Sequence, residues 1–245
     1  MKVIVIIPAA GLGTRMAAAA GGSRSGASAK SAPSKQFLQL AGMPVLVHTL
    51  RRFAASPLID EIIVALRLSE AAGFEQQLAA AGITKTVHLV EGGQSRQESV
   101  ANGLARVKAD DDDIVLVHDA VRPLVSEQII ADVIGAARLH GGAIAGVPAV
   151  DTIKLVDRSA ADALITSTVP RERAVMAQTP QGFRLALLRE AMVAALQDGF
   201  TGTDEASLVE RCGHKVAVVM GSPRNLKITT PADLELAEFY LGKEG

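Results

Sequence analysis

A glycine-rich segment near the start of the chain has the residue types that bind phosphate groups. Small side chains let backbone N–H groups approach phosphate oxygens, and an arginine at the end of the segment adds a fork of donors. A turn that only packs a strand against a helix is the structural alternative. The segment has neither the Lys-Ser/Thr pair of a P-loop nor the third glycine of a dinucleotide site. It reads Pro8-Ala9-Ala10-Gly11-Leu12-Gly13-Thr14-Arg15-Met16.

Two charged residues further along the chain extend this chemistry. Lys35 precedes a Gly-Met-Pro turn at residues 42–44, and a second cation beside phosphates would stabilise the charge that accumulates in phosphoryl transfer. Asp119 ends an apolar run, and open α/β sheets bind ligands at the carboxyl ends of their strands. A solvated loop lysine and a turn-capping aspartate are the alternatives, and we expect His118 to be a packed core residue.

The elements that position these residues follow from the hydrophobic pattern. Apolar, β-branched runs alternate with amphipathic segments, which predicts an α/β fold: a Rossmann-like, mostly parallel sheet with helices on both faces. Buried strands are predicted over residues 3–7, 62–66, 86–90, 114–118, 144–148 and 216–220. Helices are predicted over residues 45–54, 69–81, 95–107, 127–140, 184–196, 204–212 and 231–241.

Two segments depart from this alternation. Residues 17–33 are rich in Ala, Gly and Ser without an apolar face, which predicts a mobile loop. In residues 151–178, two short strands at 152–156 and 165–169 flank a polar turn, which predicts a hairpin arm over about 151–173. We expect residues 1–245 to form a single domain.

The composition narrows the class of protein. The 245 residues carry a net charge of −1, so overall charge favours neither nucleic acid nor a membrane surface as a partner. Cys212 is the only cysteine, which fits a reducing compartment. The first apolar run is too short for a membrane span and lacks the cleavage region of a signal peptide. We therefore expect a cytoplasmic protein.

Further motifs in a fixed order give the chain a family resemblance. Together with the glycine-rich segment and Lys35-Gln36, they resemble the nucleotidylyltransferases, and more narrowly the 2-C-methyl-D-erythritol 4-phosphate cytidylyltransferases of the non-mevalonate isoprenoid pathway. These motifs are Gly92-Gly93-Gln94-Ser95-Arg96-Gln97-Glu98-Ser99-Val100, Val117-His118-Asp119-Ala120-Val121-Arg122-Pro123, Asp151-Thr152-Ile153-Lys154, Gln178-Thr179-Pro180-Gln181, Thr203-Asp204-Glu205-Ala206-Ser207 and Asn225-Leu226-Lys227-Ile228-Thr229.

The resemblance implies transfer of CMP from CTP to a polyol phosphate with release of pyrophosphate. It assigns transition-state stabilisation to Arg15 and Lys35, and reading of cytosine to Gly92, Gly93 and Ser99. Many family members carry an acidic residue at Gln94, where the implied contact is through the backbone. The nucleotide-binding residues it implies are Pro8, Ala9, Ala10, Gly11, Leu12, Gly13, Gly92, Gly93, Gln94, Ser99, Asp119 and Ala120. A plain turn at Gly92-Gly93 is the structural alternative.

The resemblance also implies an acceptor site shared between two subunits. Arg171 and Lys227 would hold the acceptor phosphate for attack, and the arm would reach into the partner of a homodimer. Arg173 remains an alternative to Arg171, and a helix N-cap is an alternative role for Thr203. The substrate-binding residues it implies are Asp119, Arg122, Thr152, Arg171, Thr203 and Lys227.

Mg²⁺ is the expected cofactor, held mainly through the triphosphate, and no direct metal ligand is assigned. A ribitol 5-phosphate cytidylyltransferase is the nearest rival, because it would share the CTP site and differ in the acceptor. A sugar-1-phosphate nucleotidylyltransferase is disfavoured because the chain lacks a long β-solenoid extension. A non-catalytic CTP sensor is a rival of another class, but it would not need Arg15, Lys35 and Lys227.

Overall fold

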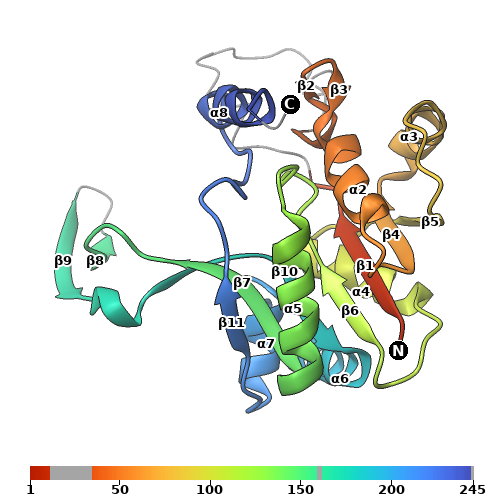
Figure 1. The fold of residues 1–245 in the computed structure, drawn as a ribbon. Helices are drawn as coiled ribbons and strands as arrows, with labels where there is room; N and C mark the ends of the chain where they lie inside the picture. The colour runs from red at the N-terminus through yellow and green to blue at the C-terminus, as the bar shows by residue number, and fades with distance from the viewer. Residues whose placement is uncertain (12–34, 159–161, 244–245) are drawn as a thin grey trace, which may run out of the picture.

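The computed structural model describes residues 1–11, 35–158 and 162–243, and within them seven strands form one central sheet (Figure 1). The strands lie in the order β11-β7-β10-β6-β1-β4-β5. Their bounds are β1 Val3–Pro8, β4 Glu61–Leu66, β5 Val87–Glu91, β6 Ile114–Val117, β7 Gly142–Pro148, β10 Val175–Arg184 and β11 Ala217–Met220. The glycine-rich segment follows β1 and Asp119 follows β6, so both lie at the same edge of the sheet.

Most of the sheet is parallel, as predicted. β1 pairs in parallel with β4 and β6, β4 with β5, and β7 with β11, whereas β10 runs antiparallel to both of its neighbours. This strand was not predicted. The edge strands β5 and β11 are only partly buried, so the prediction that all strands are buried was wrong for these two.

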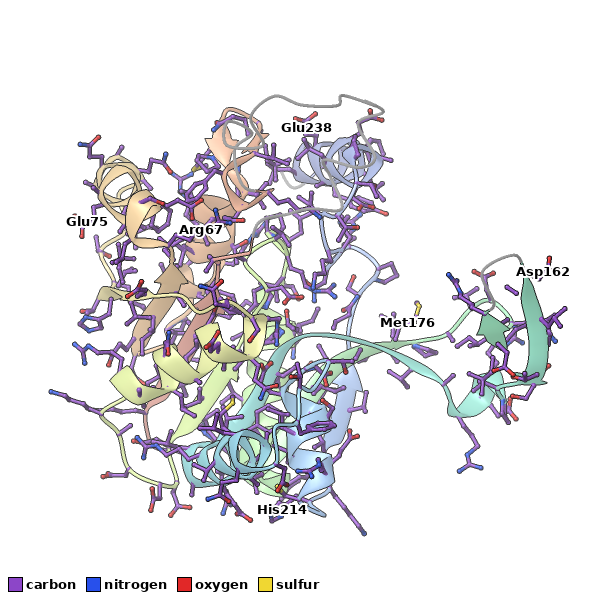
Figure 2. All side chains as sticks on the ribbon, turned by 180° about the vertical axis from the view of Figure 1, so that it is seen from behind. Arg67, Glu75, Asp162, Met176, His214 and Glu238 are labelled. Atoms are coloured by element: carbon purple, nitrogen blue, oxygen red, sulfur yellow. The ribbon has the colours of Figure 1, made fainter. Side chains whose placement is uncertain are left out.

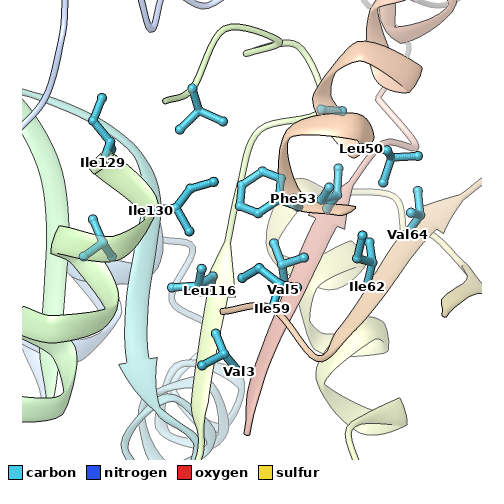
Figure 3. Packing of buried hydrophobic residues seen from close by; sticks show 14 of the residues in the cluster. Val3, Val5, Leu50, Phe53, Ile59, Ile62, Val64, Leu116, Ile129 and Ile130 are labelled. Carbon is cyan, nitrogen blue, oxygen red and sulfur yellow. The ribbon is translucent and has the colours of Figure 1, made fainter. Parts of the chain in front are cut away.

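Helices cover both faces of the sheet. Val3, Val5 and Ile7 point to one face, which packs against α2, α3 and α5. Figure 3 shows Val3 and Val5 beside labelled side chains of α2 and α5. Ile4 and Ile6 point to the other face, which packs against α4, α6 and α7. Successive side chains of a strand alternate between the two faces of the sheet. Because both faces are buried here, every residue of β1 is apolar. The helix bounds are α2 Val45–Ala55, α3 Leu68–Ala80, α4 Arg96–Arg106, α5 Glu127–His140, α6 Leu185–Gln197 and α7 Glu205–Arg211.

A third, smaller apolar cluster lies above the carboxyl edge of the sheet. It joins α8 (Pro231–Leu241) to the short strand β2 (Gln39–Leu40) and to the start of α2 through Leu40, Val45 and Ala237. The strand β2 pairs antiparallel with β3 (Met43–Pro44). The N-cap Thr230 and its partner Asp233 form a capping box, and Pro231 occupies the first turn, so α8 begins as its sequence indicates. This cluster fixes the segment that carries Lys227 beside the one that carries Lys35.

The predicted arm is a two-stranded hairpin that projects away from the sheet (Figures 1 and 2). β8 (Lys154–Arg158) pairs antiparallel with β9 (Ala163–Thr168), so the strands lie within a residue or two of the predicted positions. A short 3₁₀ turn, η2 (Arg171–Arg173), leads back to β10. The predicted loop at 17–33 lies outside the described residues. No helix in the described ranges is long and apolar enough to cross a membrane.

Candidate active site

A cleft of about 200 Å³ opens at the carboxyl edge of the sheet. Its walls come from the segments that follow β1, β5 and β6, together with η1 (Lys35–Phe37) and the segment before α8. The residues that line it are Pro8, Ala9, Ala10, Gly11, Lys35, Gln36, Gly93, Gln94, Ser95, Arg96, Ser99, Asp119, Ala120, Val121 and Lys227. The cleft thus brings together most of the nucleotide-binding residues predicted from the sequence.

Hydrogen bonds fix the described part of the glycine-rich segment. Ala9 donates its N–H to the Ala65 carbonyl at 2.8 Å, and the buried Gln36 side chain donates to the Ala9 carbonyl. Arg67 Nε donates to the Ala10 carbonyl at 2.9 Å. The backbone is therefore held in place before any ligand arrives. Leu12, Gly13 and Arg15 lie outside the described residues.

The second wall is the turn between β5 and α4. A Cβ added to Gly92 would lie 2.2 Å from the Cβ of Ala10, so only glycine fits where this turn meets the first segment. Ser99 Oγ accepts the Gly93 N–H at 3.0 Å and donates to the Ser95 carbonyl at 2.9 Å. The Ser99 hydroxyl therefore shapes the turn as well as lining the cleft. Gly92 packs behind the lining.

The N-terminus of α4 is fixed by its own capping box. Ser95 accepts the Glu98 N–H, and the Glu98 carboxylate accepts the Ser95 N–H in return. Glu98 also accepts the Gln94 N–H at 2.6 Å. The backbone donor of Gln94 is therefore already bonded in this conformation.

Asp119 lies at the centre of a cluster of charges. Its Oδ2 contacts Lys227 Nζ at 2.9 Å and Arg122 Nε at 3.2 Å, and its Oδ1 contacts Arg96 Nε at 3.3 Å. Arg96 Nη1 also donates to both oxygens of Glu205, at 2.7 and 2.9 Å. The carboxylate is bound by side-chain cations, so the prediction that Asp119 faces the site fits its position better than the turn-cap alternative.

The cations decide the protonation state of Asp119. Burial alone would raise the pKa of its carboxyl group, but Arg96, Lys227 and Arg122 outweigh burial and lower the pKa well below its usual range. Burial raises the pKa of Glu205, and the charge of Arg96 offsets only part of this rise. Asp119 is therefore an anion throughout the neutral range, and the cleft retains more positive than negative charge nearby.

Lys35 and Lys227 approach the cleft from two segments that contact each other. Lys35 Nζ donates to the Thr229 carbonyl at 3.3 Å, and Ile228 donates its N–H to Val121 at 2.9 Å. These bonds hold the segment with Lys227 against the end of β6. Two lysines that are far apart in sequence thus line one cavity.

A second cavity of about 260 Å³ adjoins the first and shares Arg96, Asp119 and Lys227 with it. Arg122 and Thr203, which the family resemblance assigns to the acceptor, line this second cavity. The N-cap of α7 is Asp204, so the alternative that Thr203 caps a helix was wrong.

The arm residues lie elsewhere in the single chain. Thr152 and Arg171 are exposed, and neither lines the two cavities. Arg171 Nη1 donates to the Val150 carbonyl at 2.9 Å, and Arg173 is exposed on the same short turn. The structure therefore does not bring them to the cleft of their own chain.

His118 is a packed core residue, as predicted. It is fully buried, its ring meets Phe53 edge to face at 4.7 Å, and Nε2 lies 3.0 Å from the Arg122 carbonyl. Nδ1 lies 3.1 Å from Thr179 Oγ1, which in turn accepts the Asp119 N–H at 3.0 Å. A neutral ring that donates from Nε2 and accepts at Nδ1 satisfies every one of these bonds.

Sequence reasoning missed two residues of the charge cluster. Arg96 and Glu205 lay within motifs that carried the family resemblance, but no role was given to them. Their pairing joins positions 109 residues apart, and no spacing rule connects them. The sequence held one indication of a role for Glu205: it is a charged residue at the start of a predicted helix whose other face is apolar.

The fold and the cleft define a class of protein. A cavity at the carboxyl edge of an open α/β sheet, walled by a glycine-containing turn and two lysines, is typical of nucleotide-dependent transferases. A family model for 2-C-methyl-D-erythritol 4-phosphate cytidylyltransferase matches residues 3–243. The chain belongs to this family.

Curated relatives and solved structures agree with the match. Enzymes of that name from Acidobacterium capsulatum and Solibacter usitatus are 58% and 48% identical to this chain, over 98% and 100% of its length and 98% and 97% of their own. The crystal structure of the Thermus thermophilus enzyme superposes with a TM-score of 0.73 at 35% identity, covering 98% of both chains. The 4-diphosphocytidyl-2C-methyl-D-erythritol synthase from Anaerococcus prevotii gives a TM-score of 0.81 at 28% identity, covering 98% and 96%.

Proposed function

We infer that the protein transfers CMP from CTP to 2-C-methyl-D-erythritol 4-phosphate and releases pyrophosphate, a step in isoprenoid precursor synthesis. The observation that carries this inference is the family match over residues 3–243. The cleft of this chain agrees with it, because it presents two lysines and an ionised aspartate. An oxygen of the acceptor phosphate attacks the α-phosphorus of CTP. One P–O bond forms, and the bond from the α-phosphorus to the bridging oxygen breaks, so pyrophosphate leaves with its electrons.

The cations act on the charge that this step develops. Lys35, with Arg15, stabilises the equatorial oxygens of the α-phosphorus, while Lys227 and Arg171 hold the acceptor phosphate in line. The position of Lys35 and Lys227 in one cavity supports this division of roles. The cytosine lies against Gly93, Ser99 and the backbone near Ala10, and Gly92 keeps that wall close.

Mg²⁺ bound through the triphosphate is consistent with the residues of the cleft. Asp119 is the only acid among the described residues that line the first cavity, and three cations already contact it. No cluster of three or more His, Cys, Asp or Glu side chains able to hold a metal occurs in the described ranges. A Mg²⁺ ion that takes its ligands mainly from phosphate and water fits this donor set, and when bound it neutralises phosphate charge.

The arm supports a homodimer with shared sites. Large apolar side chains on the hairpin are exposed, with Leu155 at 53%, Leu164 at 71% and Ile165 at 64%. Met176, in the strand that leads from the arm to the sheet, is also exposed (Figure 2). Because an isolated hairpin is marginally stable in water, a second copy of the chain is a fitting cover. Such packing would deliver Thr152 and Arg171 to the partner's cleft.

We further propose a cytoplasmic location, which suits a chain with the single cysteine Cys212.

A panel of substrates tests the function. Pyrophosphate release is measured with each nucleoside triphosphate, against 2-C-methyl-D-erythritol 4-phosphate and ribitol 5-phosphate. We expect turnover with CTP and the first acceptor, and its loss in Lys35→Ala. Preference for ribitol 5-phosphate would contradict the acceptor assignment, and CTP binding without turnover would favour a sensor.

A further inference from the structure

Glu205 is a buried carboxylate beside the cleft. It occupies the first turn of α7, where a negative charge interacts favourably with the helix N-terminus. An acid in that position can interact with the helix N-terminus while its side chain stays in water, yet the Glu205 side chain is 1% exposed. Burying an ion is costly unless a partner compensates it. Helix capping, which Asp204 and Ser207 already provide, therefore does not account for its burial.

The partner of Glu205 is Arg96, which links it to Asp119. One nitrogen, Arg96 Nη1, bonds both oxygens of Glu205 at 2.7 and 2.9 Å, while Nε lies 3.3 Å from Asp119 Oδ1. The guanidinium therefore lies between two carboxylates on different elements, and both fix its orientation. Arg96 lines both cavities, so a change in its position alters the cleft directly.

Three positively charged side chains of this cluster are shared between two carboxylates. Arg96, Arg122 and Lys227 carry three positive charges against the two negative charges of Asp119 and Glu205. Because Glu205 holds Arg96 at 2.7 Å, Arg96 makes only a long contact to Asp119 Oδ1 at 3.3 Å. The Oδ2 atom then remains for Lys227 at 2.9 Å and for Arg122 Nε at 3.2 Å.

We propose that Glu205 is a positioning residue for the transfer reaction: it anchors Arg96 so that Asp119 keeps Lys227 in place to receive the acceptor phosphate. Without the charge of Glu205, Arg96 turns onto Asp119 and displaces Lys227 from it. The proposal rests on the proposed function for the role of Lys227. It assigns to Glu205 an effect on the acceptor, although Glu205 lines neither cavity.

The test compares isosteric variants. Glu205→Gln keeps the shape and removes the charge. We expect KM for 2-C-methyl-D-erythritol 4-phosphate to rise about tenfold and kcat/KM to fall up to ~10²-fold, the loss typical of a displaced positioning group, with a smaller change in KM for CTP. Asp113→Asn is the matched control, because Asp113 is a buried carboxylate that accepts the N–H groups of Lys2 and Asp110 at the opposite edge of the sheet. This control should lose stability and keep both KM values.

A double-mutant cycle tests whether Glu205 acts through Arg96. In an Arg96→Met background, Glu205→Gln should cause little further loss, since the group that it positions is gone. Additive losses, or an unchanged acceptor KM in Glu205→Gln, would overturn the proposal. If Glu205→Gln does not fold, Glu205→Asp, which keeps the charge but shortens its reach, is measured in the same way with the same expected rise.

A crystal structure of the folded variant gives a readout independent of turnover. The proposal requires Arg96 to move towards Asp119 and Lys227 to leave it, and unchanged positions of both would overturn it. Failure of the proposed function is a separate outcome: a wild-type protein that releases no pyrophosphate contradicts the function, whereas an active wild type with an unaffected Glu205→Gln variant contradicts only the role of Glu205.

Discussion

At the scale of single residues, Asp119 both carries a charge in the cleft and fixes the positions of its neighbours. Its three cationic contacts come from α4, from the turn after β6 and from the segment before α8, so one carboxylate orients three separate elements. The end of an apolar strand predicted its position from sequence. The roles of Arg96 and Glu205 could not be predicted, because their ion pair joins the first residues of α4 and α7, which only the folded chain brings together.

The buried ring of His118 gives a prediction about pH. Burial lowers its pKa to about 4, from 6.5 in an exposed histidine, because a charged imidazolium has no water around it there. Between pH 6.5 and 4 the unfolded chain binds a proton at this residue that the folded chain does not. The free energy of unfolding should therefore decrease as pH falls through this window, by up to about 3 kcal/mol from this residue.

Two measurements check this prediction. A ¹H–¹⁵N NMR titration should show a neutral His118 ring, protonated at Nε2, down to about pH 4. Urea denaturation at a series of pH values should show a flatter pH dependence in His118→Gln than in the wild type. A ring that titrates near pH 6.5 would contradict the burial of a neutral His118.

At the scale of elements, the site depends on two turns that pack against each other at the ends of β1 and β5. The alternating pattern predicted most of the sheet, because core strands carry apolar side chains on both faces. It missed β10, whose centre carries Gln178, Thr179 and Gln181 in buried positions. Gln178 bonds with Ser222 and Asn225, Gln181 donates to Asp204, and the Thr179 hydroxyl accepts the Asp119 N–H. Only the folded chain supplies these partners.

Gly92→Ala tests the contact between these turns. The added methyl group would lie 2.2 Å from the Ala10 Cβ, so the two walls must separate. We expect a loss of about 1–3 kcal/mol in the free energy of unfolding and a raised KM for CTP. Both are measured by denaturation and by steady-state kinetics.

Gly73→Ala is the control for that substitution. Gly73 lies within α3 on an exposed face, and an added Cβ would meet no atom within 4 Å. Alanine there should stabilise the protein by about 0.5–1 kcal/mol and leave KM unchanged. A Gly92→Ala protein that behaves in the same way would show that the turns have room to spare.

At the scale of the whole molecule, the arm is the feature that a single chain does not explain. Its apolar strands are exposed and its Arg171 does not reach the cleft of its own chain. The arm itself could be predicted from sequence, because two short strands flank a polar turn. Its target could not, since in the proposed homodimer the target would belong to the second chain.

Mixing two inactive variants tests the shared site. Lys35→Ala damages the cleft and leaves the arm intact, whereas Arg171→Ala does the reverse. After subunit exchange, half of the dimers are mixed, and each has one site with an intact cleft and an intact arm. Activity should recover to about a quarter of the wild-type value. Mixtures as inactive as their components would contradict an exchanged arm, and light scattering would show whether dimers are present.

The reaction assigned to the cleft joins a cytidylyl group to a polyol phosphate. The most direct measurement is ³¹P NMR of the protein with CTP, Mg²⁺ and 2-C-methyl-D-erythritol 4-phosphate. We expect the acceptor monoester signal to be replaced by two coupled diphosphate signals, with one equivalent of pyrophosphate. Lys227→Ala should slow this conversion at low acceptor concentration. An acceptor signal that persists while ribitol 5-phosphate is converted, or CTP that stays intact with both acceptors, would contradict the assigned reaction.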